Sequence, residues 1–99
     1  MIMEVAEILV KPGTETQFEA AVQAAVPLFQ RAKGCSAMRL ERSIEQPSNY
    51  TLLVQWATVE NHMVDFRESA DFQEWRRLVG DFIAAPPVVG HTETVVPGF

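Results

Sequence analysis

The sequence predicts one α+β domain with a four-stranded antiparallel sheet and helices on one face. Segments of β-type composition and segments of helical periodicity follow each other in the order strand, helix, strand, strand, helix pair, strand. Turn-forming residues join the two middle strands, as in a hairpin. A chain of 99 residues suffices for one domain of this kind. The βαββαβ order is typical of the ferredoxin-like fold.

The first strand is expected over residues 2–11, where β-type residues place apolar side chains on both faces. One face carries Ile2, Ala6, Ile8 and Val10, and the other carries Met3, Val5 and Leu9. Pro12 and Gly13 end the strand. Thr14 and Gln17 then have the spacing of a capping box, which predicts the start of the first helix.

The first helix is expected to face the core through a stripe at helical spacing. The members of this stripe are Phe18, Ala21, Val22, Ala25 and Phe29. Pro27 lies inside the helix and predicts a bend near Gln23, because proline removes one backbone donor. Gly34 is a typical residue for the end of the helix.

A hairpin is predicted next. Its strands run from Ala37 to Ile44 and from Tyr50 to Trp56, and the stretch EQPSN supplies the turn. Alternate apolar residues of the second strand share one face, and Leu53 makes the opposite face partly apolar.

Two helices and a strand complete the chain. Thr58 is expected to cap a helix that ends near Ser69, and Ser69 is expected to cap the last helix through Asp71 or Phe72. The last helix should bury Phe72, Trp75, Val79, Phe82 and Ile83. The stretch Ala85-Pro86-Pro87 excludes further helix and leads into a final strand over residues 88–96.

Apolar residues on both faces of three strands predict a second copy of the chain. The helices of such a domain cover one face of the sheet, and an uncovered apolar face is an association surface. We therefore expect a homodimer in which two sheets pack together as a dimeric α/β barrel. Residues 89–96 are expected to reach toward the partner.

Composition and charge exclude several classes of protein. The net charge of −5, without a local run of basic residues, argues against nucleic acid or a membrane surface as partner. The N-terminal stretch lacks the basic segment of a secretory signal and includes Glu4 and Glu7, so a cytoplasmic location is expected. Cys35 is the single cysteine, and no Cys or His cluster has metal-site spacing, so neither a disulfide nor a metal site is predicted.

His62 stands out because it is a titratable residue within an apolar pattern. Val59, His62, Met63 and Phe66 fall at i, i+3, i+4 and i+7, which places the imidazole on the stripe expected to face inward. Imidazole titrates near neutral pH and can accept and return a proton. Two interpretations stay open: acid/base chemistry or ligand contact, and an interior histidine that donates one N–H to a carbonyl.

Several stretches, in order and spacing, resemble a known family. EILVKPGTETQFE, KGC, YTLLVQWATVENH, FRESADF and PPVVGHTE are similar to the antibiotic biosynthesis monooxygenases, which are dimeric α+β barrels. The resemblance implies a cofactor-independent oxygenase that oxidises phenols or quinols to quinones with molecular oxygen. The haem-degrading branch of the family has an asparagine in the first strand and an iron-binding histidine where this chain has Phe66. Haem degradation is therefore not expected here, because this chain has neither residue.

Under this resemblance, the catalytic candidates are His62, Trp56 and Arg76. His62 would be the acid, base or orienting group, and Trp56 would wall the pocket or donate its indole N–H. Arg76 would pair an anionic substrate or stabilise a phenolate or peroxide. The alternatives are core packing for Trp56 and an ion pair of Arg76 with Asp71, Glu68 or a partner's acid.

No cofactor is expected, and the candidates for substrate binding are Tyr50, Met63, Phe66, Trp75 and Phe82. His91 is interpreted as a dimer contact or as a partner of Glu93. The leading hypothesis is a monooxygenase for a small aromatic or quinol-like substrate. The alternatives are a non-catalytic dimeric module that binds a hydrophobic molecule, and an isomerase of a small carbonyl compound. A cavity on the order of a few hundred Å³ beside His62 would favour catalysis over a filled module.

Overall fold

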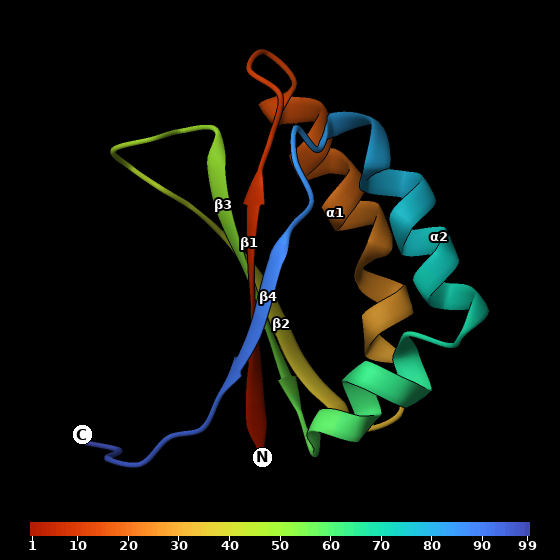
Figure 1. Ribbon diagram of the computed structural model, residues 1–99, viewed down its shortest axis with the longest axis vertical. Coiled ribbons are helices and arrows are strands. Elements are labelled where there is room, and N and C mark those ends of the chain that lie inside the picture. The colour runs from red at the N-terminus through yellow and green to blue at the C-terminus, as the bar shows by residue number, and fades with distance from the viewer.

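A computed structural model describes residues 1–99 as an antiparallel sheet with helices on one side (Figure 1). In chain order, the elements are β1 (Ile2–Leu9), α1 (Glu15–Gln30), β2 (Cys35–Arg42), β3 (Asn49–Trp56), the π-helix η1 (Asn61–Phe66), α2 (Ala70–Val79), the 3-10 helix η2 (Gly80–Phe82) and β4 (Val88–Thr92). This order, with the helices in one layer, confirms the predicted βαββαβ, ferredoxin-like α+β fold.

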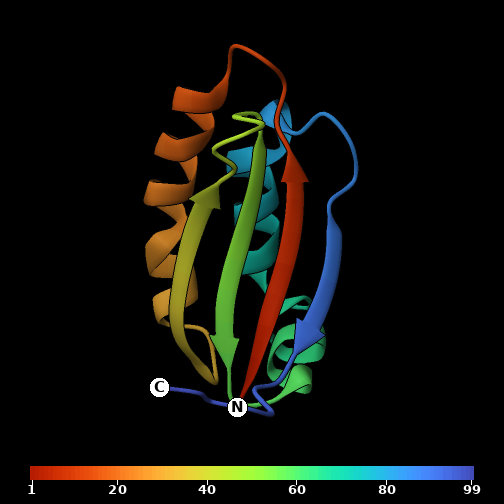
Figure 2. The ribbon, with the colours of Figure 1, turned by 90° about the vertical axis from the view of Figure 1, so that its left-hand side faces the viewer.

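The sheet has the order β2-β3-β1-β4, so the first and last strands of the chain lie side by side (Figure 2). β1 pairs antiparallel with both β3 and β4. The register places Glu4 opposite Val54 on one side and opposite His91 on the other. The topology thus brings two distant titratable residues together on one face of the sheet.

The core lies between the sheet and the helices. Alternate residues of β1 and β3 point toward the helices, because successive side chains of a strand face opposite sides. The largest fully buried side chains are Trp56, Phe18, Phe29, Leu52, Val10, Val54 and Val79. The ring of Phe29 contacts Phe66 at a centroid distance of 5.0 Å and Trp75 at 5.1 Å. These aromatic contacts join α1, η1 and α2 into one layer.

Several elements end at other residues than predicted. β1 ends at Leu9, with only an isolated bridge at Val10, and the last strand ends at Thr92 rather than at Val96. The hairpin strand expected over residues 37–44 spans Cys35–Arg42. Strand limits depend on which backbone groups find a partner across the sheet, and the local sequence does not specify this.

Thr14 does not form the predicted capping box with Gln17. Its hydroxyl donates to the carbonyl of Lys11 at 2.7 Å, and no side chain caps α1. The carboxylate of Glu15 instead accepts the backbone N–H of Gly13 at 2.9 Å. Side-chain bonds therefore stabilise the turn before α1 rather than its first helical turn.

The helix predicted after Thr58 is a π-helix. Thr58 Oγ1 accepts the backbone N–H of Asn61 at 3.1 Å, as the prediction of a cap required. The N–H of Arg67 donates to the carbonyl of His62, five residues earlier, at 3.1 Å. This spacing defines a π-helix, which is rare and often found at functional sites.

The π-helix corrects the predicted inward stripe. His62 is 3% exposed and Phe66 is buried, but Met63 is 37% exposed and Val59 is also exposed. A π-helix closes its hydrogen-bonded turn over five residues rather than four. His62 and Phe66 therefore face the core together, whereas Met63 turns outward.

Ser69 caps α2 as predicted, because its Oγ accepts the N–H of Phe72 at 3.2 Å. Trp75 and Val79 are buried as expected. The side chains that are only half-buried are Phe72, Phe82 and Ile83. None of the helices is long and apolar enough to cross a membrane.

The opposite face of the sheet has no helix over it (Figures 1 and 2). Met3, Val5 and Leu53 lie in the middle of this face and are only half-buried. Arg39 and Glu41, on β2, form an ion pair on the same face at 3.1 Å.

Candidate functional site

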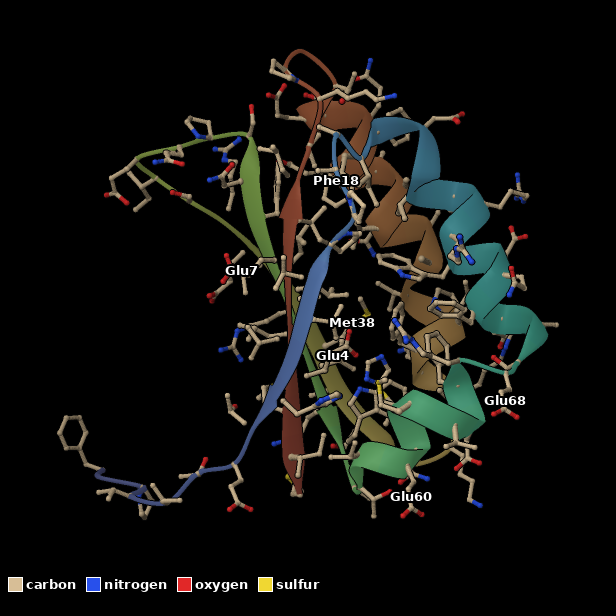
Figure 3. All side chains as sticks on the ribbon, viewed as in Figure 1. Glu4, Glu7, Phe18, Met38, Glu60 and Glu68 are labelled. Atoms are coloured by element: carbon tan, nitrogen blue, oxygen red, sulfur yellow. The ribbon has the colours of Figure 1, made fainter.

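Glu4 is a carboxylate on the inner face of the sheet. It points to the helix side of β1, whereas Glu7 points to the uncovered side (Figure 3). Only 5% of Glu4 is exposed. The alternation of the strand explains this position, because residue 4 shares its face with the buried Ala6 and Ile8.

His62 approaches Glu4 from η1. Its Nε2 lies 3.3 Å from Oε1 of Glu4, and its Nδ1 lies 2.9 Å from Nε2 of His91 on β4. His91 is only half-buried. The three titratable groups therefore form a chain that runs from the buried interior to the edge strand of the sheet.

Trp56, at the end of β3, contacts two of these three titratable groups. Its indole N–H donates to Oε1 of Glu4 at 3.0 Å. Its ring stacks on the imidazole of His62, with centroids 5.4 Å apart and an interplanar angle of 19°. Asn61, the residue before His62, donates to the carboxylate of Asp65 at 3.0 Å and anchors the first turn of η1. The neighbours of His62 thus restrict its ring orientation.

Burial shifts the pKa values of the two central groups in opposite directions. Loss of solvation raises the pKa of Glu4 to about 7, although the Trp56 N–H and the charge of Arg67 act to lower it. Loss of solvation, followed by the charges of His91 and Arg67, lowers the pKa of His62 to about 4. At neutral pH the imidazole of His62 is therefore neutral, while the carboxyl group of Glu4 can both give and take a proton.

Two proton arrangements suit this geometry. With Glu4 ionised, Nε2–H of His62 faces the carboxylate, and Nδ1 of His62 accepts a hydrogen bond from Nε2–H of His91. With Glu4 protonated, the carboxyl O–H faces Nε2 of His62, and Nδ1–H of His62 donates to His91. Two protons shift between the three groups, and Nδ1 of His91 takes up or releases a proton, when these arrangements interconvert. A proton at Glu4 can thus reach the partly exposed ring of His91.

A cavity of about 840 Å³ opens beside the chain of titratable groups. Glu4 and His62 form part of its wall, and Arg67 and Arg76 contribute cationic side chains. Its apolar wall includes Leu52, Phe72, Trp75, Val79, Ile83 and Pro86. A concave, mostly apolar site with a few polar groups is typical of small-molecule binding.

The structure brings only some of the predicted site residues to this cavity. His62, Trp75 and Arg76 line it. Trp56 lies behind the wall, where it positions Glu4 and His62. Arg76 forms an ion pair with neither Asp71 nor Glu68 of its own chain, and Asp71 pairs with Arg31 instead. The guanidinium carbon of Arg76 lies 5.9 Å from the centroid of the Phe72 ring.

The other predicted binding residues lie elsewhere. Met63 points outward, Phe66 is buried in the aromatic cluster, and Phe82 packs against the core from η2. Tyr50 donates to Glu19 at 2.5 Å, beside α1, and burial raises its pKa to about 12. None of the four contributes to the lining of the cavity, so they do not fill the space beside His62.

Sequence reasoning missed Glu4 and Arg67, and it did not predict the contact between His91 and His62. Glu4 interrupts the apolar alternation on the inner face of β1, and this interruption was a readable signal. His91 contacts His62 rather than Glu93, because the β1–β4 register places it beside Glu4. The position of Arg67 follows from the π-helix and had no signal in the sequence.

Comparison with known families matches residues 1–78 to the family described as antibiotic biosynthesis monooxygenase. The chain belongs to the antibiotic biosynthesis monooxygenase family. The match covers β1, η1 and nearly all of α2, and therefore Glu4, Trp56 and His62. It ends before β4, so His91 lies outside the matched region.

Similar proteins align with nearly the whole chain. The protein YczJ of Bacillus subtilis (strain 168), described as uncharacterized, is 37% identical over 95 residues, which cover 96% of this chain and 100% of YczJ. A crystal structure of a candidate antibiotic biosynthesis monooxygenase from Bordetella bronchiseptica is 61% identical, with a TM-score of 0.95, and the match covers 96% of this chain and 97% of that one. A candidate family member from Nitrosomonas europaea has a TM-score of 0.81 at 20% identity over 97% of this chain and 100% of its own, which shows a shared fold.

Proposed function

We propose that this member of the antibiotic biosynthesis monooxygenase family oxidises a small aromatic phenol or quinol with molecular oxygen and without a cofactor. The observation that supports the proposal most directly is the contact between Glu4 and His62 in the wall of a cavity of about 840 Å³ that is lined by both apolar and polar residues. The contact supplies a proton acceptor with a pKa near neutrality, and the cavity supplies room for the aromatic ring.

The reaction starts with removal of the phenolic proton. Glu4 in its ionised form accepts this proton, and the resulting phenolate gives one electron to molecular oxygen. The two radicals combine at a ring carbon and form a peroxide, which takes up a proton. Loss of the ring C–H and cleavage of the O–O bond then give the quinone and water. One oxygen atom becomes the new carbonyl oxygen, and the other leaves in the water with the two hydrogens of the substrate.

The surrounding residues have defined tasks in this reaction. Phe72 and Trp75 form an apolar wall on the side of α2. This wall excludes water from the radical pair. The neutral imidazole of His62 passes the proton between Glu4 and His91. Trp56 keeps the carboxyl group in place through its N–H.

We further propose that the active form is a homodimer that buries the uncovered face of the sheet. The apolar side chains Met3, Val5 and Leu53 on this face support the proposal. A domain of this size buries only about two thirds of its unfolded surface by itself.

Oxygen uptake with a panel of naphthols and hydroquinones tests the proposal. The wild type should consume oxygen with at least one member of the panel and form the corresponding quinone. Glu4→Gln keeps an oxygen that accepts the Trp56 N–H but removes the base, and should lower the rate by about 100-fold or more. Glu45→Gln, in the exposed hairpin turn, is the matched control and should have the wild-type rate. Equal rates in the three proteins would refute a role for Glu4.

Isomerisation is a second candidate, because moving a proton between two carbons of a carbonyl compound needs the same Glu4 and His62 groups but no oxygen. An anaerobic assay separates the two functions. Product that forms without oxygen, and deuterium that enters the substrate from heavy water, would favour the isomerase. A reaction that stops without oxygen favours the monooxygenase.

A further inference from the structure

Two of the six arginines differ from the others in their electrostatic surroundings. Arg31, Arg39, Arg42 and Arg77 each pair with a carboxylate of this chain. Arg67 and Arg76 have no such partner, although the chain carries a net charge of −5. The two unpaired guanidinium groups both line the cavity.

Both groups gather around one ring. The guanidinium carbon of Arg67 lies 5.7 Å from the centroid of Phe72, and that of Arg76 lies 5.9 Å from it. Phe72 is itself part of the cavity wall. Arg67 lines the same cavity as the proton-transfer groups Glu4 and His62.

Two cations around the same ring repel each other, and the ring compensates this repulsion only in part. An anion between them would compensate both charges. Guanidinium groups are well suited to this task, because their planar N–H donors match the oxygens of a carboxylate or phosphate. No acidic side chain of this chain pairs with them, so the position for an anion is open from the cavity.

We propose that Arg67 and Arg76 bind an anionic substituent, a carboxylate or a phosphate, on the aromatic substrate. This inference rests on the proposed function, since it assigns a substrate class to the same cavity. The substrate would place its hydroxyl group at Glu4 and His62 and its anionic group at the two arginines, with its ring along the apolar wall of α2.

Binding rather than turnover tests the inference. Titration calorimetry compares three ligands of similar shape: 2-naphthoate, 2-naphthyl phosphate and the neutral 2-naphthamide. At least one anion should bind about tenfold more tightly than the amide, which corresponds to about 1.4 kcal/mol. Higher salt concentration should reduce this preference, because both arginines are exposed at the cavity wall. The anion that binds more tightly identifies the substituent.

Variants show which arginines cause the preference for anionic ligands. Arg67→Gln and Arg76→Gln should each remove most of the tenfold preference. Arg77→Gln is the matched control, because Arg77 neighbours Arg76 in sequence but pairs with Glu74. The control should keep the full preference. Thermal unfolding checks that each variant is folded.

The inference is overturned if the three ligands bind equally to the wild type, or if Arg77→Gln lowers the preference as much as Arg76→Gln. These outcomes leave the monooxygenase proposal intact, because neutral phenols would still support oxygen uptake. Conversely, the proposed reaction is refuted if the protein prefers the anions but consumes no oxygen with any phenol. This outcome would still support the anion site.

Discussion

Oε1 of Glu4 lies 3.3 Å from Nε2 of His62, and both side chains are almost completely buried. Burial favours the neutral form of each group. In the folded protein at mildly acidic pH, the carboxyl group therefore holds a proton and the imidazole does not. In the unfolded chain the proton is on the imidazole instead. Both states of the pair hold one proton, so their opposite contributions to the pH dependence of stability cancel.

Glu4→Gln should reveal how the titration of His62 alone changes the free energy of unfolding with pH. The folded pKa of His62, about 4, lies below its ordinary value of 6.5, so the folded state binds fewer protons than the unfolded state between these values. The free energy of unfolding should therefore increase from about pH 4 to about pH 6.5, by about 3 kcal/mol relative to the wild type. Urea denaturation over a pH series measures this slope. A curve parallel to that of the wild type would contradict the prediction.

His62→Phe should reveal how the titration of Glu4 alone changes the free energy of unfolding with pH. This change should have the opposite sign to that in Glu4→Gln. The folded pKa of Glu4, about 7, lies above its ordinary value of 4.5, so the folded state holds the proton more tightly. Stability should therefore decrease as the pH rises from about 4.5 to about 7, again by about 3 kcal/mol relative to the wild type. Phenylalanine keeps an aromatic ring against Trp56. The same pH series serves as the measurement, and slopes of equal sign in the two variants would refute the assignment of the proton.

Trp56→Phe should show how much the hydrogen bond from the indole N–H to Glu4 contributes to stability. The loss of this donor leaves a buried carboxyl oxygen with one partner fewer and should raise the pKa of Glu4 further. We expect a loss of stability of about 1–3 kcal/mol beyond the loss of ring volume. Trp75→Phe removes a similar volume but no hydrogen bond to Glu4, and provides the control. Denaturation at pH 8 measures both variants, and equal losses would show that the hydrogen bond contributes nothing.

Gly34→Ala should disturb the anchor of the π-helix. Gly34 has a φ of +79°, and an added Cβ would lie 2.1 Å from Oδ1 of Asn61. Gly13→Ala is a matched control, because Gly13 has a φ of +91° and open space around it. The control should lose about 1–2 kcal/mol from backbone strain alone. Gly34→Ala should lose more and should also lower the oxygen-uptake rate, since Asn61 precedes His62. Thermal unfolding and rates for the two variants check this, and equal losses of stability would contradict it.

Leu53→Glu should separate the proposed dimer. Leu53 lies on the uncovered face of the sheet, opposite Val5 in the β1–β3 register. A charge at this position would be buried without a partner in a sheet-to-sheet dimer. Sedimentation equilibrium should give twice 11.1 kDa for the wild type and 11.1 kDa for the variant. Ile44→Glu changes an exposed residue of the hairpin turn and should stay dimeric. A monomeric wild type would refute the homodimer.

Much of the fold could be predicted from local patterns. The order of elements, the bond that Thr58 accepts from Asn61 and the cap at Ser69 depend on residues near each other in the chain. Among the residues of the candidate site, His62 can be predicted because a titratable ring within an apolar pattern is recognisable from the sequence alone. Glu4 also left a signal, since it interrupts an apolar face, but its partner could not be inferred from β1 alone.

The sequence by itself determined which segments become strands and helices and which faces are apolar, because periodicity and capping act over a few residues. The tertiary structure decided which polar groups meet. The β1–β4 register places His91 beside Glu4, and the π-helix turns His62 inward, Met63 outward and Arg67 toward the ring of Phe72. These contacts depend on the alignment of distant strands and on one extra residue in a helical turn, and the free energy that selects them comes from packing across the whole core.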